Sequence, residues 1–128
     1  MAKILVVDDT ALMRRLLQRI LETAGYEVVC AVDGQEGLEK VAAEKPDLVV
    51  MDWNMPQMDG LEALRALRAD PATRSLPVLM ASATSQDADI TEMEAAGANG
   101  HVSKPFHAGQ LLATVRQHLL ASPPAGYD

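Results

Sequence analysis

The strongest constraint on the fold is a short apolar stretch, Leu48-Val49-Val50-Met51, that ends on the carboxylate of Asp52 and then turns through residues 53–56. An uninterrupted apolar run bounded by a turn is typical of a strand that is covered on both faces, as in a parallel sheet. The carboxyl end of such a strand opens onto the crevice where α/β proteins bind their ligands. We therefore expect Asp52 to lie at the functional edge of a parallel sheet.

The rest of the chain alternates between strand and helix patterns. Apolar runs at residues 4–7, 27–31 and 77–82, and a short one around 101–103, predict four further strands. Apolar residues at helical spacing predict five helices. They run from Ala11 to a stop at Gly25, from an N-cap at Asp33 to before Pro46, from Leu61 to Asp70-Pro71, around Ile90 to Gly97, and across Leu111–Leu119. In the first helix, Leu12 and Leu16 belong to one apolar stripe, and Arg14 faces away from it. Five strands alternating with five helices predict a parallel sheet with helices on both faces.

Composition excludes several classes of function. The chain has 128 residues, the size of one domain, and a net charge of -7, which disfavours binding to duplex nucleic acid or to a membrane surface. The first apolar run is too short for a signal peptide or a membrane span, so we expect a cytoplasmic protein. The single cysteine, Cys30, lies in an apolar run and is expected to be a reduced core residue.

Polar side chains follow four of the predicted strands. Asp8 and Asp9 follow the first, Asp52 ends the third, Ser82 ends the fourth and Lys104 follows the fifth. In a parallel sheet all of them lie at one edge. Three neighbouring carboxylates repel one another, and a hard divalent cation such as Mg²⁺ relieves the repulsion, while a lysine neutralises phosphoryl oxygens. This combination indicates phosphoryl transfer with one carboxylate as the nucleophile.

Each of these residues also has a simpler interpretation. Asp8 and Asp9 could cap the first helix, Asp52 could be a loop acid, Ser82 a small strand-end residue and Lys104 a solvated lysine. The coincidence of four strand ends favours a site. The acidic residues of the fourth helix are typical of a solvated face. The three histidines lack the spacing of zinc ligands.

The motifs together resemble a known family. The acidic pair Asp8-Asp9, the segment D-W-N-M-P-Q-M-D-G at 52–60, the run at 77–82 and Lys104-Pro105-Phe106 are similar to those of response-regulator receiver domains. The likeness is greatest to the single-domain chemotaxis type, CheY, and extends from Lys3 to about Leu120. It implies a flavodoxin-like receiver fold with strand order 2-1-3-4-5, an order that the doubly wound folds include.

The resemblance also implies a role for each residue. Asp52 would accept a phosphoryl group from a histidine kinase. Asp9, Asp52 and the main-chain carbonyl of Asn54 would hold Mg²⁺, with Asp8 acting mainly through water. Lys104 would contact the phosphoryl group, aided by a cis peptide before Pro105. The resemblance further implies that Ser82 is the switch hydroxyl and that Asn54 and Thr84 modulate hydrolysis of the aspartyl phosphate.

One residue departs from the family pattern. His101 stands where the family usually has Tyr or Phe, at the position whose rotamer follows the switch hydroxyl. The departure concerns the output of the switch rather than its phosphorylation. Because histidine titrates near neutral pH, a pH-sensitive output is a hypothesis for this chain.

Other functions are compatible with parts of the pattern. A haloacid-dehalogenase-like phosphatase also uses an aspartate after an apolar strand, but it needs a second aspartate where this chain has Asn54. A receiver that works as a phosphorylation-independent adaptor, and the receiver part of a longer transcription factor, stay open as alternatives. We expect a receiver domain over 1–121, a loose tail over 122–128, and a monomer. The expected output surface is the fourth helix, fifth strand and fifth helix, which would bind a downstream protein such as a flagellar switch component.

Overall fold

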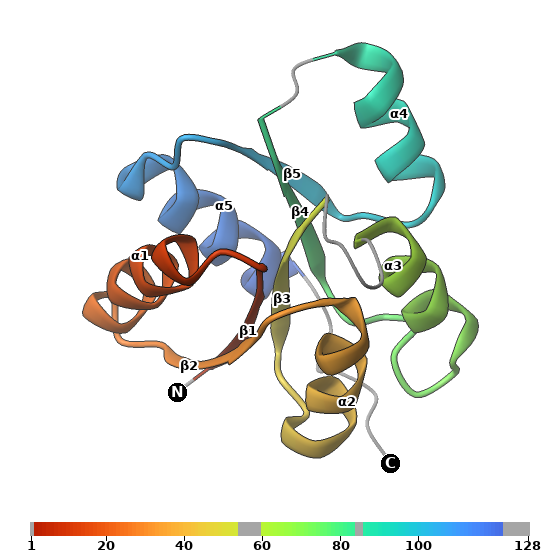
Figure 1. The fold of residues 1–128 in the computed structure, drawn as a ribbon, viewed down its shortest axis with the longest axis horizontal. Helices are drawn as coiled ribbons and strands as arrows, with labels where there is room; N and C mark the ends of the chain where they lie inside the picture. Colours follow the sequence, from red (N-terminus) through yellow and green to blue (C-terminus); the bar gives the residue numbers. More distant parts are fainter. Residues whose placement is uncertain (1, 54–59, 84–85, 122–128) are drawn as a thin grey trace.

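The computed structural model describes residues 2–53, 60–83 and 86–121, and in these ranges five parallel strands form one sheet in the order β2-β1-β3-β4-β5. The strands are β1 (Lys3–Val7), β2 (Glu27–Ala31), β3 (Leu48–Asp52), β4 (Val78–Ser82) and β5 (Gly100–Ser103). The helices are α1 (Ala11–Thr23), α2 (Gly34–Glu44), α3 (Gly60–Ala69), α4 (Asp87–Ala95) and α5 (Ala108–Ala121). The predicted fold class, with its strand order, is confirmed (Figure 1).

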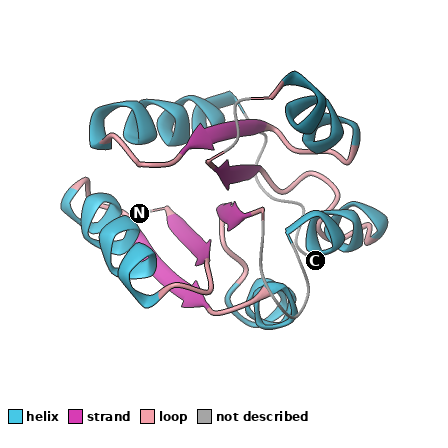
Figure 2. Cartoon of the chain, turned by 45° about the horizontal axis from the view of Figure 1, so that its top comes forward, coloured by secondary structure: helices cyan, strands magenta, loops and turns pink. Residues whose placement is uncertain are grey.

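Helices lie on both faces of the sheet (Figure 2), and an apolar core fills the space between the sheet and the helices on each face. One core packs alternate residues of β1, β3 and β4 against α2, α3 and α4, with Val41, Leu64 and Met93 among the helical contributions. The other packs the intervening strand residues against α1 and α5, through Leu17 and Leu111 among others. Because every residue of β3 is buried, the strand is covered on both sides, as its continuous apolar run predicts.

The register of the sheet brings the strand ends to one edge. Asp52 pairs with Ala81 across β3 and β4, and Ser82 pairs with Ser103 across β4 and β5. Val7 pairs with Met51, so the residues that follow β1 lie beside the end of β3. The polar residues that follow these strands are therefore neighbours in space.

The predicted helix ends agree with the structure in most cases. Asp33 is the N-cap of α2, where its Oδ1 accepts the Glu36 N–H at 2.8 Å, while Glu36 Oε1 accepts the Val32 N–H at 3.0 Å. This reciprocal pair satisfies two N–H groups at the start of the helix. Gly25 and Gly97, which follow α1 and α4, have φ values of 98° and 107°. Only glycine adopts this backbone region without strain, which explains both stops.

The N-cap of α1 is Thr10, which excludes the simpler interpretation of Asp8 and Asp9 as helix caps. Two expectations for the first half of the chain are wrong in detail. Leu12 and Leu16 were expected in the buried stripe of α1, but their side chains are 67% and 38% exposed, because α1 packs chiefly through Leu17 and Leu21. Cys30 is only half-buried, since it lies on the edge strand β2.

Among the helices of the described residues, none has the length and apolar character that crossing a membrane requires.

Candidate phosphoryl-transfer site

The site begins with three carboxylates from two strand ends. Asp8 and Asp9 follow β1, Asp52 ends β3, and one carboxylate oxygen of each lies within 4.8 Å of the others. Asp8 is 1% exposed and Asp52 is 6% exposed, whereas Asp9 faces solvent. The structure therefore brings together the three acids that the sequence predicts at one edge of the sheet.

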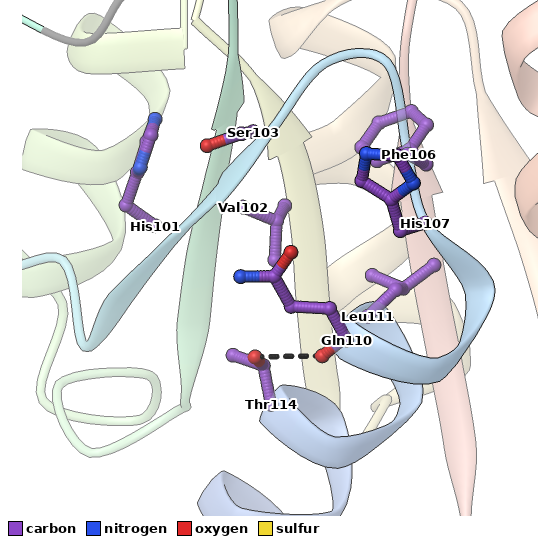
Figure 3. Close-up of a pocket in the computed structure, with 8 residues that line it drawn as sticks. All are labelled: His101, Val102, Ser103, Phe106, His107, Gln110, Leu111 and Thr114. Atoms are coloured by element: carbon purple, nitrogen blue, oxygen red, sulfur yellow. Dashed lines mark hydrogen bonds between the residues drawn. The ribbon is translucent and has the colours of Figure 1, made fainter.

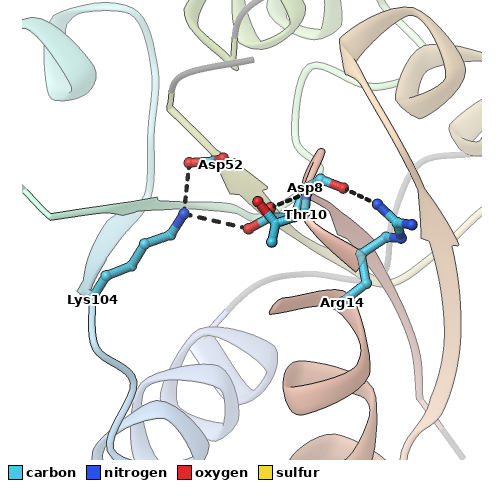
Figure 4. A network of polar contacts seen from close by, with 5 residues as sticks. All are labelled: Asp8, Thr10, Arg14, Asp52 and Lys104. Carbon is cyan, nitrogen blue, oxygen red and sulfur yellow. Dashed lines mark hydrogen bonds and ion pairs between the residues drawn. The ribbon is translucent and has the colours of Figure 1, made fainter. Parts of the chain in front are cut away.

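Lys104 supplies the opposing charge (Figure 4). Its Nζ lies 3.0 Å from Asp52 Oδ1 and 3.4 Å from Asp8 Oδ2. Partial burial of the ammonium favours its neutral form, but the contacts with Asp52 and Asp8 outweigh that effect and raise the pKa of Lys104. The lysine is therefore held in its charged form at the centre of the site. The peptide bond between Lys104 and Pro105 is cis, as the family resemblance implies.

Asp8 is held by contacts on every side. Its N–H donates to the Ala31 carbonyl at 3.1 Å, and its Oδ1 accepts the Thr10 N–H at 2.9 Å. Its main-chain oxygen accepts a hydrogen bond from Arg14 Nη1 at 2.8 Å (Figure 4). One oxygen of the Asp8 side chain thus serves the backbone and the other faces Lys104. The carboxylate of Asp9 is the more accessible member of the pair.

Ser82 is also buried at this edge of the sheet, where the pairing of β4 with β5 places it. Its main-chain oxygen accepts the Lys104 N–H at 2.9 Å, so the backbones of the two predicted site residues are joined directly. Trp53, which follows Asp52, donates its N–H to the Ala81 carbonyl at 3.0 Å and packs its half-buried ring against the core beneath α2 and α3. A structural change at Asp52 would therefore be transmitted directly to β4 and to Trp53, the only tryptophan of the sequence.

His101 lies on β5, opposite Met80 of β4. Together with Leu111 and Phe106, His101 is among the residues that line a small pocket of about 20 Å³, and in Figure 3 its side chain lies on the other side of β5 from those two. Burial lowers the pKa of His101, because the charged ring is poorly solvated there. Its Nε2 is buried and has no hydrogen-bond partner within the ranges that the structure describes. His101 is thus separated from the acidic cluster and belongs to the α4–β5–α5 side.

Two predicted site residues, Asn54 and Thr84, lie outside the described residues, as does the predicted tail at 122–128.

The chemistry of the cluster fits Mg²⁺. The donors are carboxylate oxygens, which this hard cation prefers, and Mg²⁺ is usually bound by one or two carboxylates together with water and phosphate oxygens. The exposed Asp9 and the Asp52 side chain at the strand end supply such oxygens without a closed protein cage.

Comparison with known proteins decides the family. A family model of the response regulator receiver domain matches residues 4–116. The chain belongs to the response regulator receiver domain family. Receivers are components of two-component signalling, so this receiver is a signalling domain. The sequence resemblance is confirmed over nearly its whole length.

Solved structures agree with this assignment. The receiver is similar to the chemotaxis protein CheY4 of Vibrio cholerae, with 38% identity, a TM-score of 0.87, and coverage of 91% of this chain and 98% of that chain. It is similar to the receiver domain of a signal transduction histidine kinase from Syntrophus aciditrophicus, with 30% identity, a TM-score of 0.87, and coverage of 94% and 91%. A third likeness is to the receiver domain of a sensor histidine kinase from Pseudomonas aeruginosa, with 26% identity, a TM-score of 0.87, and coverage of 94% and 98%. That structure has a magnesium ion coordinated in the active site cleft.

Two contributors to the site were missed by the sequence analysis. Arg14 was assigned to the outward face of α1, but its guanidinium reaches back to the main chain of Asp8. Its position four residues after the N-cap Thr10 could have predicted this contact, because a long side chain in the first turn of a helix can reach the preceding loop. Gly60 begins α3 with its N–H donating to the Trp53 carbonyl at 2.9 Å, and nothing in the sequence alone marks that approach.

Proposed function

We propose that this receiver is a phosphorylation switch of a two-component system, in which Asp52 accepts a phosphoryl group from the phosphohistidine of a sensor kinase. The observation that carries the proposal is the contact of Lys104 Nζ with both Asp52 and Asp8, beside the exposed carboxylate of Asp9. This arrangement supplies a nucleophile, a cation for phosphoryl oxygens and donors for Mg²⁺ at one edge of the sheet.

In the reaction, an Asp52 carboxylate oxygen forms a bond to phosphorus as the bond between phosphorus and the imidazole nitrogen of the kinase breaks. Mg²⁺ bound by Asp9, Asp52 and the Asn54 carbonyl would neutralise charge on the phosphoryl oxygens, with Asp8 acting mainly through water. Lys104 holds the phosphoryl group as its ammonium leaves Asp52 for a phosphoryl oxygen. Asn54 and Thr84 are proposed to modulate hydrolysis. The protein catalyses only its own phosphorylation and dephosphorylation and is not otherwise an enzyme.

The kinase needs access to Asp52 from the open edge of the sheet, and α1 borders that edge. Leu12 and Leu16 are exposed one turn apart on this helix, and apolar side chains exposed together are typical of contact surfaces. We assign them to the contact with the helix that carries the phosphohistidine.

The output is proposed to pass through Ser82. Phosphorylation adds roughly 1.5 to 2 negative charges, which offers the Ser82 hydroxyl a new acceptor. The change then reaches His101, α4 and α5, and this surface binds a downstream signalling protein, such as a flagellar switch component. A pH-sensitive output through His101 predicts that His101→Phe alters partner affinity of the phosphorylated protein between pH 6 and 8. Equal affinities of both proteins throughout that range would contradict it.

We further propose a receiver domain over 1–121 with a tail over 122–128, a monomeric state, a cytoplasmic location, and no direct contact with nucleic acid or membrane. The net charge of -7 supports the absence of nucleic-acid binding. Size-exclusion chromatography with light scattering, before and after phosphorylation, tests the monomer.

Trp53 fluorescence tests the central proposal, because the ring directly follows Asp52. Mg²⁺ is titrated first, acetyl phosphate is then added, and Asp52→Asn serves as the control. We expect a saturable response to Mg²⁺, then a reversible response to acetyl phosphate that Asp52→Asn lacks. A folded protein that responds to neither reagent would contradict the switch and favour the phosphorylation-independent adaptor.

A further inference from the structure

Arg14 makes an unusual contact for a residue of an exposed helix face. From the first turn of α1, its Nη1 donates to the main-chain oxygen of Asp8 at 2.8 Å, while its own N–H donates to the Thr10 carbonyl at 3.0 Å. The side chain is half-buried and spans the loop that joins β1 to α1 (Figure 4). The three residues of that loop include both acids that precede α1.

The contact has a specific geometric effect because a peptide unit is planar. The Asp8 carbonyl, the Asp9 N–H and the two flanking α-carbons lie in one plane. A donor that fixes the direction of the Asp8 oxygen therefore fixes the orientation of the whole peptide plane, and with it the position of the Asp9 α-carbon. Arg14 touches Asp8, but the residue whose placement it determines is Asp9.

Asp9 needs such support more than its neighbours do. The Asp8 side chain is held by the Thr10 N–H and by Lys104, and Asp52 is held by Lys104 and by the sheet. Within the described ranges, no donor is hydrogen-bonded to the exposed carboxylate of Asp9. Its position in the acidic cluster is therefore set by its own backbone.

We propose that Arg14 is a positioning residue for the metal site, which orients the Asp8–Asp9 peptide so that the Asp9 carboxylate faces Asp52. This inference rests on the proposed function, because it concerns the Mg²⁺ that the acidic cluster would bind. It assigns Arg14 no contact with metal or phosphate.

Position and charge predict opposite effects of removing Arg14. If the guanidinium acted only through its charge, its loss would make the cluster more negative and would strengthen Mg²⁺ binding. If it acts by orienting the loop, its loss frees Asp9 and weakens binding. A hydrogen bond from a charged group contributes enough free energy that its loss should weaken Mg²⁺ binding by about five-fold.

The experiment is a Mg²⁺ titration followed by Trp53 fluorescence in wild type, Arg14→Met, Arg14→Lys and Arg15→Met. Arg15 is the matched control, because it is the next residue of α1, carries the same charge and is exposed. We expect Arg14→Met to bind Mg²⁺ about five-fold more weakly and Arg14→Lys to retain affinity within about two-fold, since an ammonium can also donate to the Asp8 oxygen. Arg15→Met should bind as wild type does.

A second measurement uses the metal-free protein. The backbone amide resonance of Asp9 should shift in Arg14→Met and stay near its wild-type position in Arg15→Met, because only the former releases the peptide. Thermal unfolding without metal identifies any variant that does not fold, and Arg14→Leu, which also lacks a donor and favours the helix, then replaces Arg14→Met.

The outcomes separate the two proposals. If wild-type Trp53 does not respond to Mg²⁺, the proposed function fails. If wild type responds and Arg14→Met binds Mg²⁺ equally or more tightly, the function stands and the role of Arg14 is overturned. Equal weakening in Arg15→Met would also overturn it, because the effect would then not depend on the hydrogen bond from Arg14 to Asp8.

Discussion

The α-carbon of Gly60 faces the main-chain oxygen of Asp52 so closely that a Cβ at position 60 would overlap that oxygen. The same Cβ would lie 2.7 Å from Met80 Cε. The start of α3 is therefore fitted directly against the residue that ends β3. The backbone at Asp52 is held from above by a helix as well as from the sides by the sheet.

Gly60→Ala should consequently disturb both stability and the site. The added methyl meets main chain, which cannot rotate away, so we expect a loss of about 1–3 kcal/mol in the free energy of unfolding, as for other overpacked positions. The Mg²⁺ response of Trp53 should weaken with it. Gly109→Ala is the control, because nothing lies within 4 Å of a Cβ there and the variant should gain up to about 1 kcal/mol from helix propensity. Urea unfolding of both variants measures the difference, and a Gly60→Ala protein as stable as Gly109→Ala would refute the close fit.

Lys104 makes the free energy of unfolding depend on pH in the alkaline range. Its contacts with Asp52 and Asp8 outweigh its partial burial and raise its pKa above the unfolded value of 10.5. The unfolded chain therefore releases this proton first, so the contribution of Lys104 is fully present below about pH 10.5 and is lost as the pH rises through the folded value. Urea unfolding between pH 9 and 11.5 should show a steeper loss of stability in wild type than in Lys104→Met. Parallel curves for the two proteins would show that the ion pairs contribute nothing to folding.

His101 makes the free energy of unfolding depend on pH in the mildly acidic range. Burial lowers its pKa below the ordinary value of 6.5, so the unfolded chain binds a proton that the folded chain resists. Its contribution is complete above about pH 6.5 and decreases as the pH falls towards the lower folded value. His101→Phe, which also removes the buried Nε2 without a partner, should lose less stability than wild type between pH 7.5 and 5.5. His107→Phe replaces an exposed histidine and serves as the control. An identical pH dependence in His101→Phe and wild type would exclude this effect.

Arg68 joins α3 to the segment between α4 and β5. Its guanidinium donates to the carbonyls of Gly97 at 3.0 Å and Thr73 at 3.2 Å, and to Asn99 Oδ1 at 2.8 Å. Hydrogen bonds from charged groups contribute about 1.5–3 kcal/mol each when their partners are left buried, so Arg68→Met should cost about 2–4 kcal/mol after discounting the exposed member. Arg68→Lys should rescue little, because one ammonium cannot replace the planar fork. Arg65→Met, on the exposed face of the same helix, is the comparison in thermal unfolding, and equal losses in both variants would contradict this role.

The sequence predicted the features that depend on local periodicity. The apolar run of residues 48–51 identified a strand covered on both faces, and the polar residues after four strands identified one edge of a parallel sheet. Asp33 and Gly25 identified helix ends because their side chains, or lack of one, act within a few residues. These features require no knowledge of distant contacts.

The features that were missed depend on which elements meet. The apolar residues of α1 covered too broad an arc to show that Leu12 and Leu16 stay exposed while Leu17 and Leu21 are buried. Arg14 and Arg68 belong to a residue type that is usually exposed to solvent, and only the folded chain places carbonyl oxygens within their reach. The fit of Gly60 against Asp52 likewise arises from packing a helix on the end of its preceding strand. The cis peptide before Pro105 came from the family resemblance alone.

The contacts of α4 have a consequence for how the output surface can move. Its buried side chain, Met93, and the Gly97 carbonyl held by Arg68 both lie at the carboxyl end of the helix, whereas Ser82 lies beyond its amino end. A displacement that begins at Ser82 therefore reaches the end of α4 that is farther from its attachment. On phosphorylation, α4 should rotate about its carboxyl end near Gly97, so that a spin label at position 87 moves further than one at position 95. The downstream partner would then recognise the orientation of α4, while the segment at Gly97 keeps its position.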